Sequence, residues 1–537
     1  MNPQLRTICR WSAVTLAGLA GLTVLFYAEE NWRGKRAWEN YRLTAEARGE
    51  RFSWATFATN TVPDDQNFFK APIFRGLMTV EWDEKTQDWK QDSPQTADRF
   101  KISPYRSDGS FPVENGGDWS RMRFVRLENW QDYYRRPQTN RTDRTASESV
   151  SNALRHAHIY ALPNLPATNL AVVFPIAPQP QTPAADILLA LSVYDPVIEE
   201  LREASHRPFA RLGGYSAIER GLSPMFLYFL SDMKSCFQVL QLRTVAELAD
   251  NQPAQALDDV QLMLRLDDKL RQEPLLIEHL VSIALTAMTL QPIYEGLAQH
   301  CWNDAQLAEL ESVLAKKDFL ADYQLAMRGE RTFAIDAIEN QRITRQIKTM
   351  AEVAGKPKEE TISLRWMPSA FFYQNELAFA QLHEQLILPL LDMTNRIIAP
   401  AAVRRADAAV QAELKHYNPY KVQALMVFPA ISASVKKFAK IQSQVDLARV
   451  ANALERFRLA HGEYPETLDP LAPQFIAQLP HDLINGLPLY YRRTEDGSFV
   501  LYSVGWDEKD DGGKIFFTES GAIDREKGDW VWQYPVK

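Results

Sequence analysis

An uncharged apolar stretch near the N-terminus constrains this chain more than any other feature of its sequence. The stretch covers residues 11–28, follows Arg6 and Arg10, and is long enough to cross a bilayer as a helix. A helix is required there because hydrocarbon offers no partner for exposed backbone groups. Phe26 and Tyr27 are bulky where a signal peptidase needs small residues, so we expect an uncleaved signal anchor.

The charges that flank the apolar stretch bear on its orientation. The two N-terminal arginines favour a cytoplasmic N-terminus, whereas Arg33, Lys35 and Arg36 lie at the other end and outnumber them. The charge count by itself therefore leaves the orientation open. The longest other apolar run, residues 280–294, is too short to span a membrane and predicts a buried helix.

Composition excludes several classes of protein. Hydrophobic residues at 46% and charged residues at 24% are typical of globular domains. A net charge of −8 argues against a nucleic-acid binder, and the basic clusters VRRAD and VKKFAK are interpreted as helix-surface charges. Three cysteines exclude a disulfide-rich scaffold. Cys236 and Cys301 lie in apolar helical contexts, where free cysteine packs as a small hydrophobe.

Changes in pattern along the chain predict five segments. Frequent Pro and Gly argue against long helices before the linker PQPQTPAAD, and helical periodicity follows it. The fold class is therefore mainly α with α+β ends. The segments are a signal anchor at 1–28, a helical stalk at 29–50, an irregular aromatic-rich α+β region at 51–183, a helical domain at 184–433 and a C-terminal domain at 434–537.

The helical domain is best patterned between residues 226 and 317. One helix ends at DNQP, a second runs through ALDDVQLMLRLDDKL, and a third begins after Pro274. Asn303 with Gln306 predicts the N-cap of a fourth helix. The first two helices resemble one tetratricopeptide-type hairpin. A single hairpin predicts an irregular bundle, and solenoid-like stacking of part of it is left open.

The C-terminal domain begins with an amphipathic helix whose apolar face includes Phe438, Ile441 and Val445. Gly462 lies where a left-handed helix cap is needed. The runs LPLYYRRT and SFVLYSVG predict two strands joined at Glu495-Asp496-Gly497. Because two strands alone are marginally stable, KIFFT and DWVWQY are expected to add strands.

This order of elements resembles the globular domain of type II secretion pseudopilins. The matching residues are Gly462, Tyr464, Pro465, Ser503, Gly505, Asp507, Asp511 and the Gly512-Gly513 pair. The whole chain is similar to large bacterial envelope proteins that end in such a module. It lacks the Gly-Phe-Thr-Leu-x-Glu segment with which pseudopilins begin, so we do not expect it to polymerise as they do.

The resemblance implies a structural Ca²⁺ ion in the acidic loop after the strands. Its ligands would be Asp507 and Asp511 with a carbonyl near Tyr502 or Ser503, and Asp510 adds a carboxylate to the same loop. Hard cations bind about six to eight oxygen atoms, which a turning acidic loop can supply. The alternative is a solvated acidic loop without an ion.

Other motifs with chemical potential are weaker. His156 and His158 can form a transition-metal pair on a strand, but no further ligand lies near them in sequence. The sequence has no GxSxG elbow, no GxxxxGK[ST] loop and no GxGxxG loop. The acid pairs at 258–259 and 267–268 are interpreted as solvated helix faces, because adjacent residues on a helix diverge.

The apolar stretch predicts a single-pass membrane protein, and the resemblance implies the inner membrane with most of the chain in the periplasm. We expect a non-catalytic interaction or scaffold protein that contacts the membrane through its N-terminal helix and does not bind nucleic acid. The resemblance implies envelope or secretion-system proteins as partners. The alternative is a hydrolase-like enzyme whose site lies between the N-terminal region and the helical domain.

Overall fold

The computed structural model of the protein is mostly helical, with short antiparallel strands concentrated in its C-terminal part. This confirms the mainly α fold class with a small C-terminal sheet; the tetratricopeptide likeness stays a prediction. The structure describes residues 3–53, 62–74, 80–83, 88–91, 100–106, 110–113, 116–136, 172–211, 224–347, 362–364, 366–416 and 418–535.

The chain forms two compact units, each assembled from separate stretches. Unit 1 comprises Met1–Thr59, Met327–Pro389 and Arg404–Ser432, and unit 2 comprises Asn60–Ala326, Leu390–Val403 and Ala433–Lys537. Three helices supply residues to both units, namely α13 (Phe319–Thr344), α16 (Pro400–Leu414) and α17 (Val422–His461). Consecutive segments cannot describe such units, and the five predicted segments stay a prediction.

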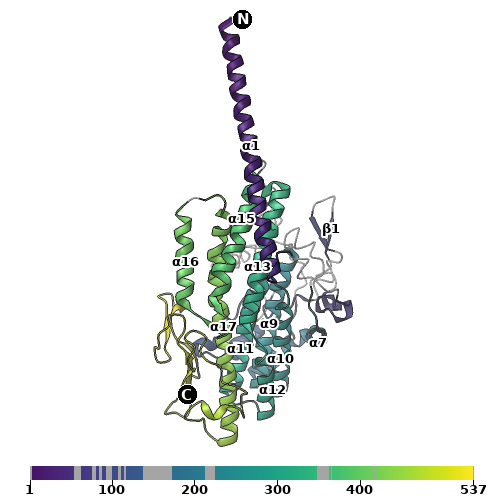
Figure 1. Cartoon of the computed structure of the whole chain (residues 1–537). Helices are drawn as coiled ribbons and strands as arrows, with labels where there is room; N and C mark the ends of the chain where they lie inside the picture. Colours follow the sequence, from purple (N-terminus) through teal and green to yellow (C-terminus); the bar gives the residue numbers. More distant parts are fainter. Residues whose placement is uncertain are drawn as a thin grey trace. The chain divides into compact units, whose positions relative to one another are not determined.

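Unit 1 is built on α1 (Pro3–Ala47), one helix that contains the apolar stretch and the predicted stalk. Side chains 11–28 are exposed, whereas one face packs on α15 (Ser369–Leu382) from Glu30 onward. Figure 1 shows α1 extending beyond α15 as a single helix. Its N-terminal part is long and apolar enough to span a membrane.

The core of unit 1 packs against the C-terminal part of α1. Trp38 and Phe52 share an apolar cluster with Ile335 of α13. The buried Arg331 side chain donates to Glu50 Oε2 at 2.6 Å and lies over the Phe52 ring. The remaining short elements that include unit 1 residues are β3 (Gln346–Ile347), β4 (Ile362–Ser363), the π-helical turn η7 (His383–Ile387) and η8 (Leu388–Leu390).

The helices of unit 2 begin and end close to the positions that the sequence predicts. Asn303 and Gln306 form a reciprocal capping box at the start of α12, as expected. The helix α11 has an apolar window that is 61% buried, which fits the predicted central helix. The helices are α6 (Pro183–Leu191), α7 (Asp195–Ser205), α9 (Pro224–Ala249), α10 (Pro253–Leu270), α11 (Leu276–Ala298) and α12 (Asp304–Leu314).

The irregular region before α6 contributes short elements to unit 2. Phe68, Phe74 and Phe100 are fully buried. The ring of Phe68 packs on Phe74, and the rings of Phe74 and Phe100 pack on each other and on Phe229 of α9. The elements are η1 (Asp64–Gln66), η2 (Phe68–Lys70), η3 (Pro72–Phe74), β1 (Val80–Asp83), β2 (Asp88–Gln91), η5 (Trp119–Arg121) and α4 (Leu127–Arg135), with η6 (Ser192–Tyr194) between α6 and α7.

The C-terminal part of unit 2 contains the expected strands. A three-stranded antiparallel sheet has the order β11-β8-β7, and β9 pairs with β10 beside it. Gly462 has φ +86° and ends α17, which confirms the predicted cap. The elements are β5 (Leu391–Asp392), β6 (Ile397–Ile398), η9 (Asp469–Leu471), β7 (Tyr490–Arg493), β8 (Phe499–Ser503), β9 (Ile515–Phe517), β10 (Ile523–Gly528) and β11 (Trp530–Gln533).

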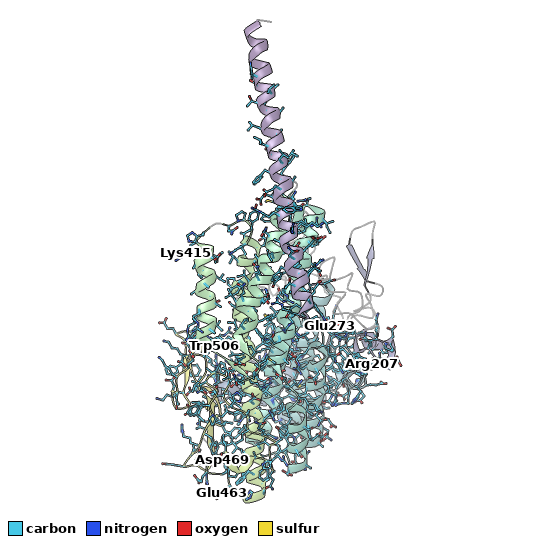
Figure 2. The ribbon with its side chains drawn as sticks, viewed as in Figure 1. Arg207, Glu273, Lys415, Glu463, Asp469 and Trp506 are labelled. Carbon is cyan, nitrogen blue, oxygen red and sulfur yellow. The ribbon has the colours of Figure 1, made fainter. Side chains whose placement is uncertain are left out.

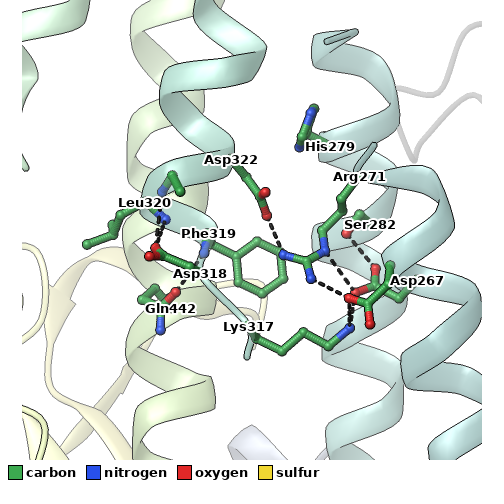
Figure 3. Close-up of polar contacts among 12 residues, drawn as sticks. Asp267, Arg271, His279, Ser282, Lys317, Asp318, Phe319, Leu320, Asp322 and Gln442 are labelled. Atoms are coloured by element: carbon green, nitrogen blue, oxygen red, sulfur yellow. Dashed lines mark hydrogen bonds and ion pairs between the residues drawn. The ribbon is translucent and has the colours of Figure 1, made fainter. Parts of the chain in front are cut away.

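The prediction that the paired aspartates form solvated helix faces is wrong for one member of each pair. Asp258 is exposed and Asp268 is partly exposed, but Asp259 and Asp267 are fully buried. Figure 3 shows Asp267 facing Ser282 of α11 and the cations Arg271 and Lys317. Adjacent helix positions do diverge, but one member of each pair here faces the interior, where positive partners lie beside it.

Candidate functional site

Unit 2 contains a pocket of about 830 Å³ that is bounded by three helices. Side chains of α9, α11 and the part of α17 after Ala433 form its sides, and the segment 116–125 and β10 add further walls. The stripe on α17 is Ala433, Lys436, Lys437, Lys440, Ile441 and Gln444, and its spacing of three and four residues puts these positions on one helix face.

Four basic side chains line the pocket, and among the described residues only one of the four has an acidic ion-pair partner. Lys436 pairs with Glu526 at 2.5 Å and lies 5.3 Å from the ring centroid of Trp506, which Figure 2 labels. Within the part of the chain that the structure describes, no carboxylate forms an ion pair with Lys437, Lys440 or Arg525. The pocket therefore carries positive charge that the described residues do not neutralise by ion pairing.

Lys440 is the least exposed of these three basic groups. Burial lowers the pKa of its ammonium group, and the positive charges of Arg525 and Lys436 lower it further, while Asp118 raises it. A negatively charged ligand would relieve this repulsion and raise the pKa of Lys440 again. The electrostatic field of the pocket thus favours an anion.

Three glutamine side chains provide further polar groups. Gln238 and Gln241 lie on α9, and Gln444 lies on α17 and is 8% exposed. In the described ranges none of the three side chains has a hydrogen-bond partner. A primary amide both donates and accepts hydrogen bonds, so these groups can bind a ligand with mixed polarity. Trp119 and Trp130 add aromatic surface to the lining.

The segment 116–125 is held against α11 by two polar side chains. Gln291 Oε1 accepts from Trp119 N at 2.6 Å, and Glu295 Oε1 accepts from Val125 N at 2.9 Å and from Gln291 Nε2 at 2.7 Å. Burial raises the pKa of Glu295 to about 7, although these hydrogen bonds oppose the rise. A Cβ at Gly117 would lie 2.2 Å from Gln291 Nε2, so this close approach requires glycine.

Three of the four residues predicted to hold calcium bond to different partners within the protein. Ser503 is buried and donates to Asp482 Oδ1 at 2.9 Å, while Asp510 Oδ1 accepts from Tyr502 Oη at 3.0 Å. Asp507 Oδ2 accepts from Gly528 N at 3.3 Å. Among the residues that the structure describes, no group of three or more acidic, His or Cys side chains is placed to hold a metal ion. Calcium binding stays a prediction.

The sequence analysis missed the residue that organises the acidic loop. Asp529, between β10 and β11, accepts backbone N–H bonds from Asp511, Gly513 and Lys514 at 3.3, 2.7 and 3.3 Å. Burial raises the pKa of this carboxyl to about 6 against the opposing effect of those bonds. Asp529 follows a glycine far from the acidic run, so no local pattern marks it.

Two histidines and two cysteines of the described ranges have a clear local environment. His156 and His158 lie outside the described residues. Burial lowers the pKa of His279 to about 4 and of His383 to about 3, so both imidazoles are neutral near pH 7. Cys236 and Cys301 are free thiols, as expected.

The pocket itself was also missed by the sequence analysis, which interpreted VKKFAK as surface charge. The available signal was the spacing of Lys436, Lys440 and Gln444, which repeats every four residues on the helix. Polar residues at that spacing, opposite an apolar face, indicate a helix face exposed to solvent. They line a pocket only where another part of the chain packs opposite them, which the spacing does not reveal.

Compared with protein-family models, with curated proteins and with solved structures, the chain matches none.

Proposed function

We propose that this chain is a membrane-anchored, non-catalytic binding protein whose unit 2 takes an acidic segment of a partner protein into the pocket. The observation that carries the proposal is the set of three basic groups, Lys437, Lys440 and Arg525, that line one pocket and form no ion pair with an acid of the described residues. Like charges are gathered at a cost in repulsion, which a bound anion offsets.

A peptide fits the pocket better than an isolated small anion. The cavity volume of about 830 Å³ lies in the upper part of the range for ligand pockets. The amides of Gln238, Gln241 and Gln444 match the alternating donors and acceptors of a peptide backbone. Trp119 and Trp130 offer aromatic surface to an apolar side chain of the same segment.

The membrane and envelope parts of the proposal rest on the N-terminal helix and the resemblance. The N-terminal part of α1 is long and apolar enough to span a bilayer, and the rest of the helix packs on α15 within unit 1. The resemblance of the C-terminal part to pseudopilins supports an inner-membrane protein with its bulk in the periplasm. Envelope or secretion-system proteins are then the natural source of the acidic segment.

A hydrolase-like enzyme is the second candidate, and the position of the pocket favours it. The pocket is lined by residues of the irregular region as well as by α9 and α11, where the sequence analysis placed a catalytic site. Its described lining contains neither His nor Cys, however. Its two acids are engaged, Asp118 with Ser120 and Glu526 with Lys436, which leaves no free acid–base pair.

The test is binding of a labelled acidic peptide to the full chain in detergent micelles. The variant Lys437→Gln/Lys440→Gln/Arg525→Gln should bind the peptide at least about tenfold more weakly, because charge-assisted contacts are lost. The matched control Lys509→Gln/Lys514→Gln/Lys527→Gln removes the same charge from exposed positions outside the pocket lining.

Four outcomes of this experiment would contradict the proposal. In the first, the two triple variants bind the acidic peptide equally well. In the second, a peptide with Gln and Asn in place of its acids binds the native chain as well as the acidic peptide does. Binding of succinate or phosphate without binding of any acidic peptide would reassign the pocket to a small anion. Turnover of an ester or peptide that the pocket variant abolishes would favour the enzyme.

A further inference from the structure

The second inference concerns unit 1 and rests on the proposed membrane anchor. The apolar stretch 11–28 has a length of about 27 Å as a helix, close to the hydrocarbon thickness of a bilayer. Charged side chains begin at Glu29, directly after it. If the stretch spans, the boundary between hydrocarbon and headgroups lies near Tyr27 and Ala28.

Several contacts place the turn before α15 at this boundary. Tyr27 Oη donates to Trp366 O at 3.1 Å, and Ala370 N donates to Asn31 Oδ1 at 2.8 Å. A Cβ at Gly34 would lie 3.1 Å from Ala370 Cα, which shows how closely the two helices approach. The turn that contains Trp366 is therefore level with the last apolar residues of α1.

The same turn presents apolar side chains to the surroundings. Trp366 is 84% exposed, and Met367 beside it is also exposed. Trp32 on α1 is 62% exposed and Ile343 near the end of α13 is 67% exposed. Tryptophan is enriched where a membrane meets water, because its ring is apolar while its N–H can still reach polar groups.

The turn is held firmly. Arg345 donates to Met367 O at 2.7 Å and to Ser369 Oγ at 2.7 Å, and its guanidinium group lies 5.2 Å from the ring centroid of Phe372. Exposure of Trp366 is thus built into the local structure. Arg33 and Lys35, half exposed on α1, are placed to meet anionic headgroups.

We propose that Trp366 and Met367 insert into the headgroup layer of the bilayer that α1 crosses. This second contact would fix unit 1 against the membrane surface and limit its rotation about the anchor. The partner of this surface is the lipid bilayer, because the contacts with α1 set the turn at the depth of the interface. A protein partner at the same turn is an outcome that the experiment below detects.

The experiment places an environment-sensitive NBD label at single cysteines of the full chain in liposomes. Trp366→Cys is compared with Leu43→Cys, an exposed α1 position about 24 Å further along the helix than Tyr27. Cys9 and Cys301 are replaced by Ser. Cys236 is kept because burial raises the pKa of its thiol and shields it from the label.

We expect NBD at position 366 to emit at shorter wavelength than NBD at position 43, and to be quenched by lipids that carry a shallow spin label. Equal emission at both positions would overturn the inference while leaving the anchor intact. A blue-shifted but unquenched label would also overturn it, since protein rather than lipid would then cover the turn. Protein that does not float with the liposomes would overturn the anchor itself, and this inference with it.

Discussion

Lys317 illustrates how single residues hold charge inside unit 2. Its wholly buried ammonium group donates to Leu264 O, Asp267 Oδ2 and Asp268 Oδ1 at 2.8, 2.8 and 2.7 Å (Figure 3 labels Lys317 and Asp267). Burial tends to raise the pKa of Asp268, but Lys317 and Arg271 lower it below its ordinary value. A buried pair of this kind destabilises the fold strongly when one partner is removed.

Replacing Lys317 by Met should lower the free energy of unfolding by about 3–5 kcal/mol, because Asp267 would remain buried with less positive charge beside it. The measurement is urea unfolding of the full chain in detergent. Lys316→Met is the matched control, since Lys316 is the adjacent lysine and is exposed. Equal stability of the two variants would show that the ammonium group contributes little.

Glu295→Gln tests the raised pKa beside the pocket wall. The unfolded carboxyl titrates near 4.5, whereas the folded one titrates at about 7. Between these values the folded chain holds a proton that the unfolded chain has released, so this group lowers the free energy of unfolding as pH rises, by up to about 3 kcal/mol. Below 4.5 and above 7 its contribution no longer changes.

Glutamine has no such titration, so the melting temperature of Glu295→Gln relative to the native chain should rise between pH 4.5 and pH 7. The comparison within one pH series cancels the titration of the other buried groups. A difference that is constant across this range would mean that Glu295 is ionised in the folded protein.

At the scale of elements, the wall segment 116–125 depends on the absence of a side chain at one position. A Cβ at Gly117 meets Gln291 at 2.2 Å and Val125 N at 2.9 Å, whereas a Cβ at Gly116 has nothing within 4 Å. Gly117→Ala should therefore displace the wall, lower the melting temperature and weaken binding of the acidic peptide. Gly116→Ala should leave both measurements nearly unchanged, and a similar effect of the two would contradict the assignment.

The acidic loop after β8 is the element for which calcium is predicted. Calcium, but not magnesium, should raise the melting temperature of the full chain, and Asp507→Ala with Asp511→Ala should remove that rise. Asp529→Asn should lower the melting temperature with or without calcium, because Asp529 accepts three backbone N–H bonds of the loop. A melting temperature that does not respond to calcium would leave Asp529 as the organiser of the loop.

At the scale of the whole molecule, the N-terminal helix is the proposed membrane anchor. The chain has one N-terminal helix long and apolar enough to cross a membrane, whereas the similar window of α11 is largely buried in unit 2. We therefore expect the full chain to stay with membranes in alkaline carbonate and to be released when residues 3–28 are deleted. Alkaline phosphatase fused after Lys537 should be active, as expected for a periplasmic C-terminus; an inactive, stable fusion would reverse the orientation.

Local patterns in the sequence determined the helical character of the chain, the end of α9 before Pro253, the cap at Asn303, the left-handed glycine at 462 and the C-terminal strands. Each depends on residues within a few positions of one another, whose backbone preferences and hydrogen bonds are the same in any protein. For the same reason the apolar stretch could be recognised as a candidate span.

Tertiary structure alone decided which charged residues are buried and which line a pocket. The alternation at Asp258 and Asp259 does not say which carboxylate faces the cations of α7 and α9, and VKKFAK resembles any solvated helix face. The pocket requires α9, α11, α17 and β10 together, and these elements are distant in sequence. Their meeting depends on how helices pack, which sets the burial of each side chain and therefore its charge, its partners and its chemistry.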